Sequence, residues 1–164
     1  MIRKLNLSVK PFSINGMYYS QKAVKTQAAR EWTYDVFSEL SSEKNRRAME
    51  ELGEAFDPGS QYFRIKLIAF YPKKYLLTKA NAISAKSIDI TNWEKPLVDL
   101  IFLPKHQQKE EPFGCQNIGY DDRYICEMSS CKMPWEHSDH GIIVEIEIKN
   151  NQDLYRNLGP DLGI

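Results

Sequence analysis

Alternation of apolar and polar residues indicates four β-strands in this chain. A strand buried on one face reads apolar and polar in turn, because successive side chains point to opposite faces. The pattern is clearest between Phe63 and Ala69, where every second residue is apolar, so we expect this strand to lie inside a sheet. The predicted strands are Ile2 to Val9, Gln61 to Tyr71, Tyr120 to Lys132 and Gly141 to Lys149.

Helical spacing of apolar residues occurs between the first two strands. A helix buries one face when apolar residues recur every three or four positions. This pattern begins near Thr26, can break at Ser41-Ser42, and then resumes until the turn sequence Asp57-Pro58-Gly59 ends it. The stripe that we expect to pack on the sheet consists of Trp32, Val36 and Leu40.

A second helical pattern covers residues 92–103, with Thr91 or Asn92 as a possible N-cap. A basic loop over residues 72–87 precedes it. The predicted order of elements is therefore β-α-β-α-β-β. This order predicts a single α/β (α+β) domain over residues 1–150, in which helices pack on a mixed, mainly four-stranded sheet, and a peripheral tail over residues 151–164.

The length and composition are typical of one globular domain. The chain has 164 residues and is 42% hydrophobic, which suffices to bury a core without disulfides. Its three cysteines are an odd number, which favours reduced thiols. No stretch approaches the roughly 18 apolar residues of a membrane span, so we expect no membrane association and a cytoplasmic location.

The net charge is formally zero, from 22 basic and 22 acidic residues, but its distribution is uneven. Residues 1–30 and 71–88 contain lysines and arginines and no acid, whereas acids concentrate in residues 31–57. A basic face of this kind suits a polyanion such as nucleic acid. Ordinary surface lysines remain the alternative explanation.

Aspartates recur in two strings about twenty residues apart. The first string, Asp89-Ile90-Thr91-Asn92-Trp93-Glu94-Lys95, leads into the predicted helix that carries Asp99, and the second is Asp121-Asp122. These strings resemble the signature of the RusA-like Holliday junction resolvases, which are crossover junction endodeoxyribonucleases. In that family an Asp-x-Asp-Asn-x-x-Lys run leads into a helix with another Asp, and an Asp-Asp pair opens the next strand. The resemblance covers roughly residues 5 to 148.

The resemblance implies a DNA endonuclease that uses Mg²⁺ or Mn²⁺. A divalent ion held by a few carboxylates can activate water and stabilise the charge that develops during phosphodiester cleavage. Thr91 stands where many members have the second aspartate, so we do not expect Thr91 to bind metal directly, and Asp121 can supply part of the missing charge. By position, the resemblance assigns catalytic roles to Asp89, Asp122 and Lys95, metal ligation to Asp89, Asp121 and Asp122, and supporting roles to Thr91, Asn92 and Asp99.

The resemblance also implies a four-way DNA junction as substrate and a homodimer, in which two sites related by a two-fold axis nick opposite strands. Genes of this family are frequently carried by phages and prophages, which implies a recombination or repair role on the DNA of a bacterial host. The residues that we expect to contact DNA are Asn15, Lys73, Lys74, Lys79, Lys86 and Lys132.

Other interpretations of the same residues stay open. Lys95 and Asp99 are four residues apart and can form a simple surface ion pair. Glu145, Glu147 and Lys149 fall on one face of a strand, as in the PD-(D/E)xK nucleases, although any half-exposed strand has this pattern. A non-catalytic protein that binds branched DNA is a further alternative. A zinc site is a last alternative, although the spacing of its candidate ligands fits poorly; these are Cys115, Cys126, Cys131, His137 and His140.

Overall fold

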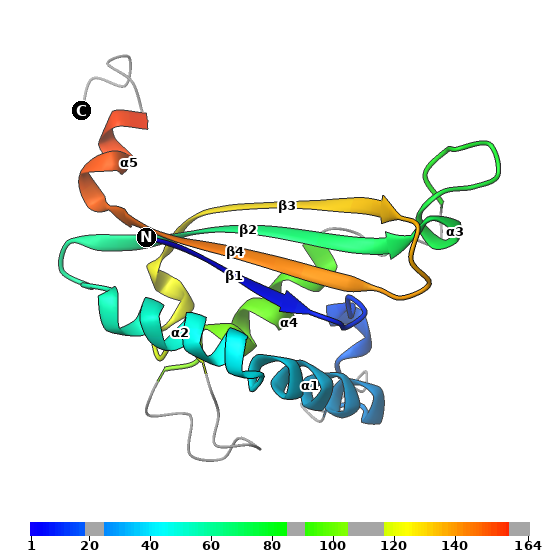
Figure 1. The fold of residues 1–164 in the computed structure, drawn as a ribbon, viewed down its shortest axis with the longest axis horizontal. Helices are drawn as coiled ribbons and strands as arrows, with labels where there is room; N and C mark the ends of the chain where they lie inside the picture. The colour runs from blue at the N-terminus through cyan, green and yellow to red at the C-terminus, as the bar shows by residue number, and fades with distance from the viewer. Residues whose placement is uncertain (19–24, 85–90, 105–116, 158–164) are drawn as a thin grey trace.

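A computed structural model describes residues 1–18, 25–84, 91–104 and 117–157 of the chain. It is a mixed α/β fold in which three helices cover one face of a four-stranded sheet (Figure 1). The strands are β1 (Ile2–Leu7), β2 (Gln61–Pro72), β3 (Ile125–Trp135) and β4 (Gly141–Asn150). The helices are α1 (Gln27–Leu40), α2 (Glu43–Ala55), α3 (Lys73–Leu76), α4 (Thr91–Ile101) and α5 (Asn151–Asn157), and two short 3₁₀ turns are η1 (Ile14–Gly16) and η3 (Asp122–Tyr124).

The strands lie in the order β1-β4-β2-β3. Strand β4 is antiparallel to both β1 and β2, whereas β3 runs parallel to β2. The predicted mixed, four-stranded sheet is therefore confirmed, and β2 lies inside it as expected. Strand β3 forms one edge. No helix in the described ranges combines the length and the apolar composition needed to cross a bilayer.

The core lies between the sheet and helices α1, α2 and α4 (Figure 1). Alternate residues of β2 from Phe63 to Ala69 are at most 1% exposed, which confirms the face that the alternation predicts. The apolar stripe of α1 is buried on the other side of this core, and Thr26 accepts a hydrogen bond from the Ala29 amide at 3.1 Å as the N-cap. That cap satisfies one of the free amides at the helix start.

The chain turns between α1 and α2 at Ser41-Ser42, as expected, and a buried asparagine holds this corner. The side-chain nitrogen Nδ2 of Asn45 donates to the backbone carbonyls of Asn6 and Glu39, each at 2.9 Å. The side-chain oxygen Oδ1 of Asn45 accepts from the backbone amide of Asn6 at 3.1 Å. Asn45 is 2% exposed. A buried side chain with three such bonds ties the corner to the adjoining strand β1.

We expect Asn45→Ala to lower the free energy of unfolding by about 2–4 kcal/mol, because it removes three hydrogen bonds to partly buried backbone groups. Urea denaturation measures this loss. Asn6→Ala is the matched control, because Asn45 contacts only backbone atoms of Asn6 and the Asn6 side chain is exposed. Equal losses in the two variants would contradict this account.

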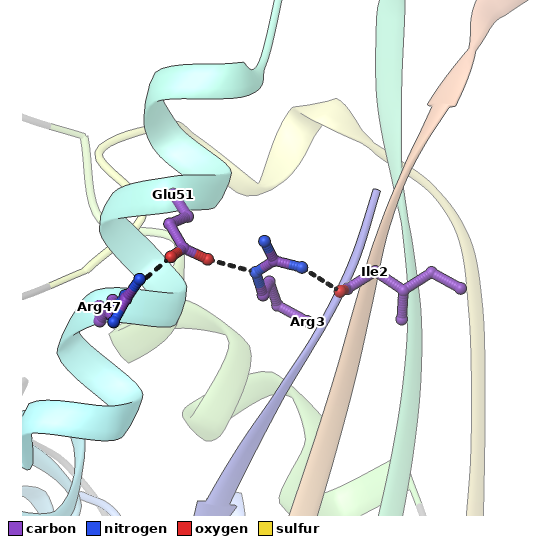
Figure 2. Close-up of polar contacts among 4 residues, drawn as sticks. All are labelled: Ile2, Arg3, Arg47 and Glu51. Atoms are coloured by element: carbon purple, nitrogen blue, oxygen red, sulfur yellow. Dashed lines mark hydrogen bonds and ion pairs between the residues drawn. The ribbon is translucent and has the colours of Figure 1, made fainter.

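Ionic contacts attach α2 to the edge strand β1. Figure 2 shows the carboxylate of Glu51 between two arginines, Arg47 one turn away on α2 and Arg3 on β1. Arg3 also donates to the carbonyl of Ile2 at 2.9 Å. These hydrogen bonds from Arg3 and Arg47 lower the pKa of Glu51. Because the groups are solvent-accessible, the contacts fix the orientation of α2 more than they add to stability.

Two predicted boundaries are wrong. Strand β3 begins at Ile125 and not at Tyr120, because the side chain of Asp121 caps the 3₁₀ turn η3 by accepting from the Arg123 amide at 3.0 Å. The expected loop after β2 begins with a short helix, α3, whose Leu76 is 2% exposed against the sheet. Directly after β4, residues 151–157 of the predicted tail form helix α5.

Candidate active site

Helix α4 presents three of the predicted site residues on one face. Its apolar residues Trp93, Leu97 and Ile101 recur every four positions and are fully buried. Burying this stripe turns the opposite face outward. That outward face carries Asn92, Lys95 and Asp99, of which Asn92 is partly exposed and the other two are exposed.

The Asp121-Asp122 turn is held by aromatic packing. Tyr120 and Tyr124 lie on either side of the two aspartates, and both rings form T-shaped contacts with Phe56, with centroid distances of 4.8 and 5.4 Å. The hydroxyl of Tyr120 also donates to the Phe56 carbonyl at 3.4 Å. Two aromatic anchors on one buried ring fix the turn at the start of β3.

The two elements meet through Lys95. Its ammonium group donates to Asp122 Oδ2 at 2.8 Å and to Asp99 Oδ1, so it bridges carboxylates from α4 and from η3. The side chains of Lys95, Asp99 and Asp122 are 55, 48 and 40% exposed, so solvent and a ligand can reach them. Beside them is an open hollow of about 280 Å³ lined by Glu94, Lys95, Val98, Asp122, Ile125, Cys126 and Met128.

The bridge sets the charges of the site. The hydrogen bond from Lys95 holds the pKa of Asp122 below its usual value, and bonds to Asp122 and Asp99 raise the pKa of Lys95. The Lys95 bridge therefore joins one cation to two carboxylates, and the net charge of −1 for these three groups favours an additional cation. Because the folded pKa of Asp122 is lowered, its contribution to stability is present above the ordinary carboxyl range and is lost as the pH falls; solvent exposure keeps it small.

We expect Lys95→Met to move the pKa of Asp122 upward, toward the usual value, because the largest cause of its depression is removed. A carboxyl-carbon NMR titration of the folded protein measures the change. Lys66→Met is the matched control, because Lys66 is an exposed lysine on β2 that pairs in register with Glu145, on the face of the sheet opposite α4. An unchanged pKa of Asp122 in Lys95→Met would contradict the contact between Lys95 and Asp122.

Glu94 is a site residue that sequence reasoning missed. It lines the same hollow as Asp122, and its carboxylate accepts a hydrogen bond from the hydroxyl of Ser130 on β3. In the sequence it stands at an unassigned position of the aspartate string. The signal available was its place beside Lys95 at the start of a helix, but the approach of β3, which gives Glu94 a partner, is a tertiary contact.

The remaining predicted site residues either lie outside the described ranges or lie on other parts of the fold. Asp89 and Lys86 lie outside the described residues, and Thr91 is the first residue of α4. Asn15 is exposed in η1, a turn that contacts α4, so the early segment of the chain does reach this helix. Lys132 lies on β3 and pairs in register with Ala69, which puts it on the face of the sheet that α4 covers.

Asp121 and Asp122 have the donor chemistry that a hard divalent cation prefers. Mg²⁺ takes oxygen ligands and often only one or two carboxylates, with water completing the shell. Asp121 and Asp122 are neighbours at the start of η3, so the two carboxyls belong to one site. Within the described ranges, no three or more His, Cys, Asp or Glu side chains are grouped to hold a metal. The two aspartates fit Mg²⁺ or Mn²⁺ as a partial ligand set.

Three of the predicted DNA-binding lysines gather elsewhere. Lys73 and Lys74 on α3 and Lys79 in the following loop line a hollow of about 590 Å³ together with Leu77, Thr78 and Ser84. Helix α3 lies at the arrowhead end of β3 (Figure 1), whereas Asp122 lies in η3, just before the start of that strand. The structure therefore groups these lysines with one another but not with the acidic residues.

The residues of the alternative nuclease pattern face away from this site. Glu145 pairs with Lys4 at 3.0 Å, Glu147 with Arg64 at 3.4 Å, and Lys149 with Asp153 at 3.9 Å. Their register places them on the face of the sheet opposite α4, as alternation predicts.

The residues of the alternative zinc pattern are spread out. Cys126 and Cys131 are free thiols on β3, and His140 stacks on Tyr75 at 5.5 Å. His137 packs against Trp135, and Cys115 lies outside the described residues. The described members are therefore not gathered around one point.

No protein-family model matches this chain, and no curated protein matches its sequence at a significant level. Its function is therefore inferred from its own residues and their arrangement.

Proposed function

We propose that the chain is a metal-dependent, structure-selective DNA endonuclease that resolves four-way junctions, similar to the RusA-like resolvases. The observation that carries this proposal is the contact between Lys95 and Asp122, which are 27 residues apart in the sequence and 2.8 Å apart in space. Both were singled out by the aspartate strings. An accessible lysine that bridges two carboxylates beside an open hollow is an arrangement suited to phosphodiester hydrolysis.

In this proposal Asp122 and Asp121, with Asp89, hold the divalent metal. When bound, the metal supplies a more acidic water and an electrostatic partner for the phosphate. Lys95 contributes a fixed positive charge. An ammonium group has three hydrogens, and donating two of them to Asp122 and Asp99 leaves a third that can reach a phosphate oxygen. Asp99 is a positioning residue, because it orients Lys95 through the i, i+4 contact.

The remaining parts of the proposal concern the substrate. Lysines on α3 and in its following loop hold backbone phosphates, which makes affinity fall as salt rises. A homodimer presents two sites to opposite strands of one junction. The biological setting that follows is recombination or repair of DNA in the cytoplasm of a bacterial host, on phage or prophage DNA.

Purified protein incubated with labelled four-way, flap and linear duplex DNA tests the proposal. We expect paired nicks near the branch point of the four-way junction, only when Mg²⁺ or Mn²⁺ is present. Cleavage of linear duplex at the same rate would indicate a nuclease without structure selectivity. Failure to cleave any substrate would overturn the enzymatic assignment.

Binding of branched DNA without catalysis is the second candidate function. One observation favours it: the described residues provide two adjacent carboxylates and no larger metal-binding group, while Lys95 already neutralises part of Asp122. This candidate predicts tight junction binding that is unchanged by Mg²⁺ and is never followed by cleavage. The same set of substrates, analysed by gel shift and by denaturing gel, separates the two functions.

A further inference from the structure

The hollow lined by Lys73, Lys74 and Lys79, here called the lysine hollow, is an ordered feature of the fold. Helix α3 is anchored by buried Leu76 and by the stacking of Tyr75 on His140 at 5.5 Å. The loop after it is closed by backbone hydrogen bonds, including Ser84 N to Leu76 O at 2.8 Å. The three lysines are exposed. Lys73 lies 3.9 Å from the carboxylate of Glu136, so the four charged groups carry a net charge of +2. A net positive group on a fixed frame is suited to bind phosphates.

The lysine hollow lies a definite distance from the candidate active site. Strand β2 pairs with β3 from Phe63 opposite Ile125 to Pro72 opposite Trp135. The nine residue steps from Phe63 to Pro72, at about 3.3 Å each, span roughly 30 Å. Asp122 lies just before the first pair, and Lys73 directly follows the last (Figure 1). One turn of B-DNA measures about 34 Å, or about 10 base pairs.

The carboxylates beside β3 between the two places, Glu94 and Glu127, each accept a hydrogen bond from a neighbouring side chain. The only acid of β3 is Glu127, and its carboxylate accepts a hydrogen bond from Tyr62 and pairs with Arg64 at 3.8 Å on the other face of the sheet. Lys132 adds a positive charge on the side of α4. The exposed residues that β3 contributes are all uncharged: Cys126, Met128, Ser129, Met133 and Pro134.

We propose that one duplex arm of the substrate lies along the edge strand β3, with its branch end at Lys95 and Asp122 and its backbone held by the lysine hollow about one helical turn away. This inference rests on the proposed function and adds a geometric requirement to it. An arm needs about 10 base pairs beyond the branch point to reach the lysine hollow. Shorter arms lose these contacts.

Hairpin-closed four-way junctions with arms of about 6 or about 16 base pairs test the requirement, because these lengths lie on either side of one helical turn. Binding is measured without added metal by fluorescence anisotropy over a range of salt concentrations. The test variant carries Lys73→Ala, Lys74→Ala and Lys79→Ala. The control carries Arg30→Ala, Lys44→Ala and Arg46→Ala, which remove the same charge from α1 and α2.

The wild-type protein and the control should bind long arms at least about 10-fold more tightly than short arms at physiological salt. The lysine variant should lose this advantage, and its salt dependence on long arms should weaken by a slope of about 3, because each phosphate contact contributes about 0.9. Hydroxyl-radical footprints should lose protection about one turn from the branch point.

Equal loss of affinity for short and long arms would overturn this inference, because the lysines would then contact DNA at the branch itself. Unchanged affinity for both would overturn it as well. The proposed function is judged separately, by Mg²⁺-dependent nicking of the short-armed junction, which does not need the lysine hollow. If the wild-type protein protects long arms but never nicks any junction, the proposed path of the DNA arm is supported and the proposed endonuclease activity is rejected.

Discussion

Replacing Asp122 with asparagine should reduce junction cleavage by at least about 100-fold while leaving junction binding intact. Loss of outer groups around a metal typically costs 10–100-fold, and a direct ligand costs at least as much. The substitution keeps the size of the side chain and removes its negative charge. It also removes an exposed ion pair with Lys95, which adds little to stability. Single-turnover cleavage with Mg²⁺, alongside gel-shift binding without metal, measures both quantities.

Asp35→Asn is the matched control for this variant. Asp35 is exposed on α1 and lines a different hollow, near Trp32. Its replacement should leave the cleavage rate within about 2-fold, because it takes no part in the ion pairs that join Lys95, Asp99 and Asp122. Retention of cleavage by Asp122→Asn would remove Asp122 from the metal site and, with it, the main support for the proposed function.

Replacing Phe63 with alanine should lower the free energy of unfolding by about 3–5 kcal/mol, the usual cost of deleting a buried aromatic ring. Phe63 is fully buried at the start of β2. Its ring stacks on Phe56, with a centroid distance of 4.0 Å, and forms a T-shaped contact with Phe102 at 5.2 Å. Urea denaturation followed by circular dichroism measures the loss.

The same substitution should also disturb the turn that carries Asp121 and Asp122 in the candidate active site. Phe56 supports Tyr120 and Tyr124, the rings that flank Asp121 and Asp122, so a cavity beside it loosens the turn that bears the carboxylates. We therefore expect weaker cleavage under conditions in which the variant is still folded. Ile83→Ala is the control, because Ile83 is 67% exposed and its loss should cost less than about 0.5 kcal/mol. A loss below about 1 kcal/mol for Phe63→Ala would contradict its place in the core.

The elements of this fold follow from local periodicity. Alternation from Phe63 to Ala69 predicts both the strand β2 and its buried face, and the spacing of Trp32, Val36 and Leu40 predicts the buried stripe of α1. These signals are reliable because burial of one face imposes a period of 2 on a strand and 3.6 on a helix. The N-cap at Thr26 and the break at Ser41-Ser42 are local for the same reason.

Local patterns could not give the start of β3. A polar and aromatic stretch such as Tyr120 to Tyr124 can alternate like a strand, and whether it joins the sheet depends on its neighbours. Here the rings of Tyr120 and Tyr124 pack on Phe56, which comes from the far end of α2. That packing, together with the cap from Asp121, makes a 3₁₀ turn more stable than an extended chain at this point.

The sequence by itself determined which residue types could carry the chemistry: the aspartate strings, Lys95 with Asp99 one turn later, and the lysines after β2. The tertiary structure alone decided which of them meet. Lys95 reaches Asp122 because α4 packs beneath the sheet beside the start of β3, Glu94 gains Ser130 in the same way, and the lysine hollow is held at the other end of that strand. Spacing along the chain fixes the neighbours within a helix or a strand. Contacts between elements depend on strand order and on the packing of buried side chains, which no local pattern contains.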